Sequence, residues 1–191
     1  MSTFFLSQFE LLFEPITPKA PPPINPSPAV PDPVIVQAYF VLISNVGPAP
    51  LDLSLKFTST LPLMGNTITI FDIDNQFPPN NNKAEPYPAS NVVTLGTLAP
   101  TETGLFLLQP DIAELLKTLS PPGDITAADY AARGYAEVTA PVGRALITPQ
   151  TRGTFLSQSS ILPLALNVIA QEAYTLPIPQ GAGVSGNLFD F

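Results

Sequence analysis

Residues 34–58 read VIVQAYFVLISNVGPAPLDLSLKFT, and this stretch decides the class of fold. Val34–Ser44 is rich in β-branched and aromatic residues, which favour a strand. Leu51–Thr58 alternates strictly between apolar and polar side chains, as a half-buried antiparallel strand does. The Gly- and Pro-containing segment Asn45–Pro50 between them is typical of a turn. The stretch therefore predicts two consecutive strands of an antiparallel sheet.

The same strand signals continue on both sides of this stretch. We expect further strands at Thr67–Ile73, Asn91–Leu95, Thr103–Leu108, Tyr135–Thr139, Arg144–Thr148 and Gly153–Ser157. Many short strands separated by turn signals are typical of two packed antiparallel sheets. The sequence therefore predicts a mostly β chain, in the form of an antiparallel β-sandwich of immunoglobulin-like or jelly-roll type.

One segment has a helical pattern instead. Asp111 is a candidate N-cap, and Glu114 follows it at the spacing of a capping box. Four apolar residues then fall on one helix face: Ile112, Leu115, Leu116 and Leu119. A second short helix is expected over Ala127–Arg133. The sandwich is thus predicted to carry one or two short helices in an insert at about 110–134.

The chain begins with an aromatic segment followed by a proline-rich one. Met1–Phe13 contains four Phe and fits a strand, or a helix with Phe5, Phe9, Leu12 and Phe13 on one side. Aromatic residues favour the strand. Residues 15–33 contain nine prolines, so we expect an extended, stiff, polyproline-like arm.

These composition changes divide the chain into three predicted parts. Residues 1–33 are the N-terminal aromatic segment and the Pro-rich arm, which separates that segment from the rest of the chain. Residues 34–176 are the β-sandwich domain with its helical insert. Residues 177–191 are a Gly/Pro-rich C-terminal tail that ends on an aromatic residue.

Two motifs carry a family resemblance. In residues 41–62, VLISNVGPAPLDLSLKFTSTLP, a strand leads through Asn-x-Gly-Pro to an alternating strand that ends in Leu-Pro. Residues 94–108, TLGTLAPTETGLFLL, follow a Leu-Gly-x-Leu-x-Pro-Gly turn, with Thr101 in place of its last Gly. Both motifs resemble the immunoglobulin-like repeat domains of bacterial and archaeal cell-surface proteins. The resemblance covers about the middle third of the chain, whereas the helical insert and the C-terminal half depart from it. It implies a sandwich used for display, adhesion or assembly, and carries over no catalytic residue.

Composition excludes several kinds of chemistry. The 191 residues include no His and no Cys, so the usual general base, disulfides, thiolate nucleophiles and common zinc ligands are missing. The net charge of −8 opposes binding to nucleic acid. No apolar run reaches the roughly 18–20 residues that a membrane helix needs. We therefore expect no enzyme activity, no cofactor, no nucleic-acid partner and no membrane insertion.

The remaining polar and aromatic candidates favour structural roles. Asp72 and Asp74, with the Asn residues that follow, could offer oxygen ligands to Ca²⁺, but a solvated turn is the favoured interpretation. The arginines are expected to pair with scattered acidic residues. The five tyrosines could stack on a sugar ring, but they are scattered and no Trp accompanies them, so packing is favoured. They are Tyr39, Tyr87, Tyr130, Tyr135 and Tyr174.

Two functions of different class remain open. One is a structural protein that assembles with itself into a filament, tube or layer through its apolar N-terminal arm and sandwich surfaces. Its expected interface residues are Phe4, Phe5, Phe9, Leu12, Phe13, Phe189 and Phe191. The segment 1–13 could equally fold back onto its own sandwich. The other function is a soluble oligomeric adaptor that recognises a protein or glycan through its loops. Composition favours an extracellular or cell-surface location, whereas the first residues have no features of a secretory signal.

Overall fold

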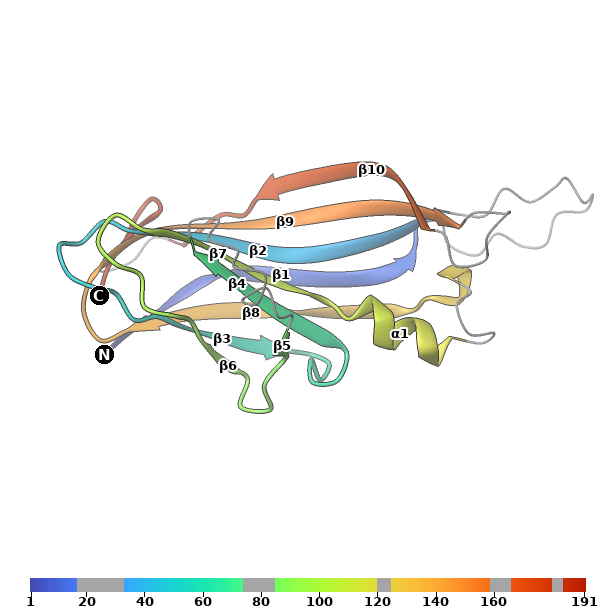
Figure 1. The fold of residues 1–191 in the computed structure, drawn as a ribbon, viewed down its shortest axis with the longest axis horizontal. Helices are drawn as coiled ribbons and strands as arrows, with labels where there is room; N and C mark the ends of the chain where they lie inside the picture. Colours follow the sequence, from blue (N-terminus) through green and yellow to red (C-terminus); the bar gives the residue numbers. More distant parts are fainter. Residues whose placement is uncertain (17–32, 74–84, 120–124, 159–165, 180–183) are drawn as a thin grey trace, which may run out of the picture.

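The computed structural model describes residues 1–16, 33–73, 85–119, 125–158, 166–179 and 184–191. Within these ranges the chain is mostly β, and its antiparallel strands form one curled sheet (Figure 1). The strands are β1 (Ser2–Pro15), β2 (Val34–Asn45), β3 (Ser54–Ser59), β4 (Thr67–Ile73), β5 (Glu85–Pro86), β6 (Val92–Thr94), β7 (Thr103–Pro110), β8 (Tyr130–Ala140), β9 (Arg144–Gln158), β10 (Leu166–Thr175), β11 (Val184–Ser185) and β12 (Leu188–Asp190). One α-helix, α1 (Ile112–Thr118), and a 3₁₀ turn, Ile125–Ala127, complete the described elements. The mostly β, antiparallel class predicted from the sequence is confirmed.

The sheet forks at β2. Its main path runs β11-β12-β9-β2-β1-β8-β3-β6, and β10 pairs with the second half of β9. On one edge of β2, residues 34–37 pair with β1, whereas residues 39–44 pair with β7, which in turn pairs with β4. Two branches therefore leave the same strand, one through β7 and one through β1 and β8.

The core lies between these two branches. Phe57 on β3 stacks on Phe106 of β7, with ring centroids 5.7 Å apart. Phe57 also contacts the rings of Phe9, Tyr39 and Tyr87, so one buried aromatic cluster joins both branches. The predicted alternation of residues 51–58 is confirmed, because its four apolar side chains are almost fully buried. They are Leu51, Leu53, Leu55 and Phe57.

The N-terminal segment is a central strand of the chain's own sheet. β1 pairs with β8 along nearly its whole length and with β2 at its C-terminal end. The backbone N–H of Ile16 donates to the carbonyl of Pro33 at 3.0 Å, so the two ends of the proline-rich segment meet. The predicted strand is thus found, whereas the predicted separation from residues 34–176 is not. Residues 17–32, and with them most of the predicted arm, lie outside the described residues.

The prediction of a second helix over Ala127–Arg133 is wrong. Only a 3₁₀ turn is present, and β8 begins at Tyr130. Pairing with β1 outweighs the local helical preference of the alanines, since Ala132 lies opposite Leu11 and is fully buried. Residue 134 must be a glycine, because a Cβ at this position would lie 1.9 Å from the carbonyl oxygen of Thr58. β8 and β3 are therefore too close for any side chain at residue 134.

We expect Gly134→Ala to lower the free energy of unfolding by about 1–3 kcal/mol or more, because backbone atoms of β3 must move. Gly153→Ala is the matched control in β9, since the nearest atom is the flexible Cδ1 of Ile35 at 3.2 Å. That variant should lose less than about 1 kcal/mol. Urea unfolding of both variants measures the difference, and equal losses would contradict the close approach of β8 and β3.

The remaining elements agree with the sequence in part. α1 is confirmed: Asp111 caps it by accepting a hydrogen bond from the N–H of Glu114 at 3.1 Å. The expected strands Arg144–Thr148 and Gly153–Ser157 are one long strand, β9, because pairing with β2 continues through Pro149. The predicted C-terminal tail contains β11 and β12, and β12 pairs with β9. Both termini therefore lie at the end of the molecule opposite α1 (Figure 1).

Candidate functional site

The aromatic residues at the two chain ends pack on each other. The ring of Phe4 lies 5.8 Å from that of Phe189 and 5.4 Å from that of Phe191. Phe189 and Phe191 stack at 6.0 Å, and Phe189 is fully buried. Three of the predicted interface residues thus form one intramolecular cluster that joins the N-terminus to the C-terminus.

The other predicted interface residues divide between the core and the surface. Phe9, Leu12 and Phe13 are buried in β1, so they serve the chain's own core in this structure. Phe5 is 40% exposed and stacks on Tyr135 of β8 with ring centroids 5.7 Å apart. Of the two open arrangements for residues 1–13, the structure has the intramolecular one, in which Phe5 alone among these four stays at the surface.

A second apolar surface lies on the side of β2 and β7 that faces away from the core. Cross-strand partners share a face of a sheet, so the pairs Phe40–Leu107 and Leu42–Leu105 lie on the side opposite Tyr39 and Val41. Neighbouring strands extend this surface. We call it the outer leucine face, and it comprises Phe40, Leu42, Ile70, Leu105, Leu107, Leu146 and Leu188.

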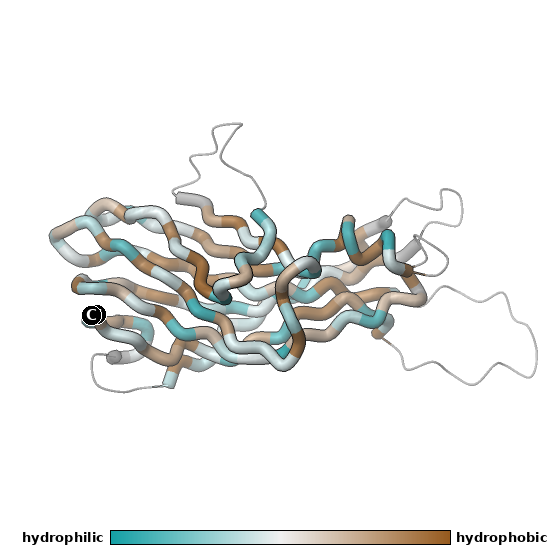
Figure 2. The backbone as a smooth tube through the Cα atoms, turned by 90° about the horizontal axis from the view of Figure 1, so that it is seen from below, coloured by the Kyte–Doolittle hydropathy of each residue, from teal (hydrophilic) through white to brown (hydrophobic). Residues whose placement is uncertain are grey.

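The outer leucine face is exposed in the described structure. Leu42 is 41% and Leu146 is 44% exposed, and the other members are partly exposed. Figure 2 marks the hydrophobic residues along the strands, from both faces of the sheet. A charged group borders the face: the Arg152 guanidinium lies 4.3 Å from the centroid of the Phe40 ring. β2 and β7 are thus apolar on both faces, as strands buried on both faces are.

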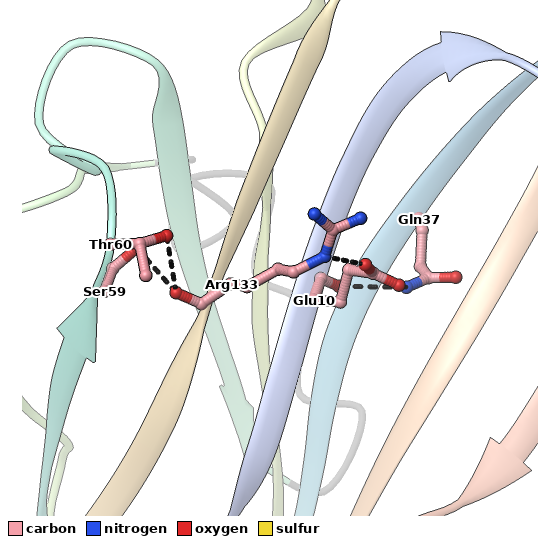
Figure 3. A network of polar contacts seen from close by, with 5 residues as sticks. All are labelled: Glu10, Gln37, Ser59, Thr60 and Arg133. Atoms are coloured by element: carbon pink, nitrogen blue, oxygen red, sulfur yellow. Dashed lines mark hydrogen bonds and ion pairs between the residues drawn. The ribbon is translucent and has the colours of Figure 1, made fainter.

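A groove of about 780 Å³ crosses β1, β2, β8, β9 and β10. The carboxylate of Glu10 accepts hydrogen bonds there from Nε of Arg133 and, at 3.1 Å, from Nε2 of Gln37 (Figure 3). The backbone carbonyl of Arg133 accepts from the N–H of Thr60 at 2.9 Å and from its hydroxyl at 3.2 Å. Hydrogen bonds therefore connect Glu10 of β1 and Arg133 of β8 with Gln37 of β2 on one side and with Thr60, which follows β3, on the other.

Aromatic side chains border the same groove. Phe5 and Tyr135 line it from β1 and β8, and Tyr174, which is 60% exposed, lines it from β10. The Tyr174 hydroxyl donates to Glu172, and this hydrogen bond raises the pKa of Tyr174. The expectation that the tyrosines do not cluster is wrong for this pair, because strand pairing brings residues 135 and 174 to one groove. Tyr39, Tyr87 and Tyr130 are buried, as expected for packing.

The other polar candidates have structural partners or lie outside the described residues. Arg133 and Arg144 pair with Glu10 and Asp190, which confirms the expected ion pairs, whereas Arg152 contacts Gln150 and Phe40. The side chain of Asp72 and all of Asp74 are outside the described part of the chain. Elsewhere in that part, no three acidic residues are grouped so that they could hold a metal ion. No helix among the described elements is long and apolar enough to span a membrane.

The hydroxyl groups of Ser7 and Tyr39 form a buried polar contact, with their oxygen atoms 2.7 Å apart. Burial raises the pKa of Tyr39 above its ordinary value, and the hydrogen bond with Ser7 acts in the opposite direction. The pair therefore joins β1 to β2 as two neutral groups.

The chain thus offers two surfaces for contact with other molecules, the outer leucine face and the groove at Glu10. No protein-family model and no curated protein matches the sequence.

Proposed function

We propose that this protein is a non-enzymatic structural protein that assembles with copies of itself. The observation that carries the proposal is the outer leucine face, because β2 and β7 have a second apolar face that the described chain leaves partly exposed. Burying apolar area stabilises an association by about 25 cal/mol per Å² before the costs of binding are subtracted. A second copy of the chain presents a matching apolar face.

The charge distribution supports a second copy as the partner. The chain has a net charge of −8, so two copies repel each other through most of their surfaces. The seven side chains of the outer leucine face are all uncharged, and the charged groups beside it on the same side of the sheet include Arg152 and the Arg144–Asp190 ion pair. Contact through this face therefore buries mainly apolar groups, and the acidic side chain beside it, Asp190, already pairs with Arg144.

We expect the double variant Leu42→Lys/Leu146→Lys to abolish this contact, because two ammonium groups would be buried in each face. Both leucines are more than two-fifths exposed in the single chain, so its free energy of unfolding should change by less than about 1 kcal/mol. Light scattering measures the particle mass, and thermal unfolding checks the fold.

The matched control is Leu61→Lys/Val142→Lys, which adds the same charge at exposed residues outside the outer leucine face. This control should keep the particle mass of the unchanged protein. Assemblies that persist in the Leu42→Lys/Leu146→Lys variant, or that dissociate equally in both, would contradict a role of this face.

A filament needs a second contact. Two copies that pack through the same face close a dimer, whereas an exchanged segment can continue an open chain of subunits. β1 suits this exchange, because it pairs with β2 and β8 through contacts that a second copy would reproduce. The proline-rich residues 15–33 could span on the order of 55 Å if extended. We therefore include exchange of β1 between copies in the proposal.

A cysteine pair distinguishes exchanged from intramolecular β1. The hydroxyl oxygens of Thr3 and Thr139 lie 2.9 Å apart across β1 and β8, and the chain contains no Cys. After oxidation, Thr3→Cys/Thr139→Cys should run as a ladder of covalent multimers on a non-reducing gel. Ser44→Cys/Thr103→Cys, placed across β2 and β7, is the control that should run as a monomer. A monomer band from both pairs would contradict the exchange of β1.

The proposal also includes the type of β-sandwich and the location of the protein. The two branches with a shared core suit a sandwich of immunoglobulin-like or jelly-roll type, in line with the resemblance of residues 41–62 and 94–108. A repeat-type display or adhesion domain works at a cell surface, and we propose that location. The partner is the protein itself, with no cofactor and no nucleic acid.

A further inference from the structure

The groove at Glu10 combines two features that the outer leucine face does not have. It has exposed aromatic rings on its borders, and it has a network of hydrogen-bonding groups between them. Its volume of about 780 Å³ lies within the roughly 300–1,000 Å³ of sites that bind small ligands. The ligand must therefore offer both an apolar surface and many hydrogen-bonding groups.

The aromatic rings at the groove are accessible to a ligand. Phe5 and Tyr135 stack on each other at an angle of 26° between ring planes, so the two rings form one continuous aromatic surface. The Tyr174 hydroxyl donates a hydrogen bond to Glu172, and its ring is 60% exposed. Tyr and Phe side chains have few rotatable bonds, so they lose little conformational entropy when a flat apolar surface stacks on them.

The polar network keeps hydrogen-bonding capacity for a ligand. The Glu10 carboxylate has about four acceptor positions, and Arg133 and Gln37 use two of them. Within the described residues, Arg133 donates through Nε alone, and Figure 3 shows its two terminal nitrogens without a marked contact. The groove thus offers acceptors and donors side by side. Glu10 and Arg133 neutralise each other, and the Glu172 carboxylate lies at the Tyr174 hydroxyl on the border, so the site disfavours an anionic ligand.

We propose that this groove binds a neutral oligosaccharide. One face of a pyranose ring is made of C–H groups and stacks on aromatic rings, while its hydroxyls both donate and accept hydrogen bonds. Phe5, Tyr135 and Tyr174 provide the stacking surface. Glu10, Arg133 and Gln37 bind the hydroxyl groups. The groove and the outer leucine face share no residue, and exchange of β1 would place Phe5 and Glu10 of a second copy in the same register, so saccharide binding does not depend on assembly.

A proline-rich peptide is the competing ligand, since aromatic grooves also bind polyproline segments. Proline lacks an N–H group, so such a peptide has few donors for the carboxylate of Glu10. The polar network therefore favours the saccharide.

The test is isothermal titration calorimetry of the full chain with cellohexaose, mannohexaose, chitohexaose and a synthetic peptide of residues 15–33. At least one oligosaccharide should bind, and Tyr174→Ala and Tyr135→Ala should each weaken binding about tenfold. Tyr174→Phe is the matched control that keeps the ring, and it should retain most of the affinity. Leu42→Lys/Leu146→Lys should bind the same oligosaccharide as the unchanged protein, whether or not assembly occurs.

Three results would overturn the proposal. They are the absence of binding by all three oligosaccharides, binding that both tyrosine-to-alanine variants leave unchanged, and binding of the peptide alone. Thermal unfolding of each variant shows whether its fold is retained. Should Tyr135→Ala unfold, Tyr174→Ala alone decides the outcome, because Tyr174 is 60% exposed on β10.

Discussion

Replacing Phe57 by Ala is expected to lower the free energy of unfolding by about 3–5 kcal/mol, the range for aromatic residues deleted from cores. Phe57 is 2% exposed and contacts the rings of four residues from both branches of the sheet. They are Phe9, Tyr39, Tyr87 and Phe106. A small side chain leaves a cavity that these rings fill only in part, and the loss is a large fraction of a typical domain's stability.

Phe5→Ala is the matched control for Phe57→Ala. Phe5 is 40% exposed and stacks on one ring, that of Tyr135, so its loss should cost about 1 kcal/mol. Urea unfolding followed by circular dichroism measures both variants. Equal losses, or a larger loss for Phe5→Ala, would show that the buried aromatic cluster does not join the two branches.

Asn45→Ala is expected to have the next largest effect, about 3 kcal/mol. The Asn45 side chain accepts from the N–H of Gly47 at 2.9 Å. It also donates to the carbonyls of Ala49 at 2.8 Å and of Leu98 at 2.9 Å. Each such hydrogen bond contributes about 1 kcal/mol, and buried groups left without a partner add to the loss. Asn45 thereby joins the two sequence motifs at residues 41–62 and 94–108.

The control for Asn45→Ala is Asn187→Ala. Asn187 is exposed and its side chain donates to the hydroxyl of Thr148 at 3.0 Å, so its loss should cost about 0.5 kcal/mol or less. Differential scanning calorimetry should show a clearly lower Tm for Asn45→Ala than for Asn187→Ala. Matching values would mean that the connection between the two turns does not stabilise the fold.

Local patterns predicted much of the fold. Residues 51–58 alternate, and their apolar side chains are buried as the period of two requires. Asp111 and Glu114 marked the start of α1, because capping depends on residues three positions apart. β4 has the predicted bounds Thr67–Ile73 for the same reason, since its pattern lies within the strand itself.

Long-range pairing decided the features that the sequence missed. The alanines of residues 131–136 favour a helix locally, yet pairing with β1 makes them a strand. The C-terminal residues are strand because β12 adds to β9. The groove unites Phe5, Tyr135 and Tyr174, which are distant in sequence. Aromatic residues in two strands could have indicated a surface cluster at Phe5 and Tyr135. Only the register of β1 and β8 brings the two residues together.

The mass of the purified full chain in solution, measured by light scattering over a range of concentrations, tests the central claim of self-assembly most directly. A single chain has a mass of 20.3 kDa. Assembly through the outer leucine face and exchanged β1 predicts particles many times heavier, with a mass that grows with concentration. A mass of 20.3 kDa at every concentration would contradict the account.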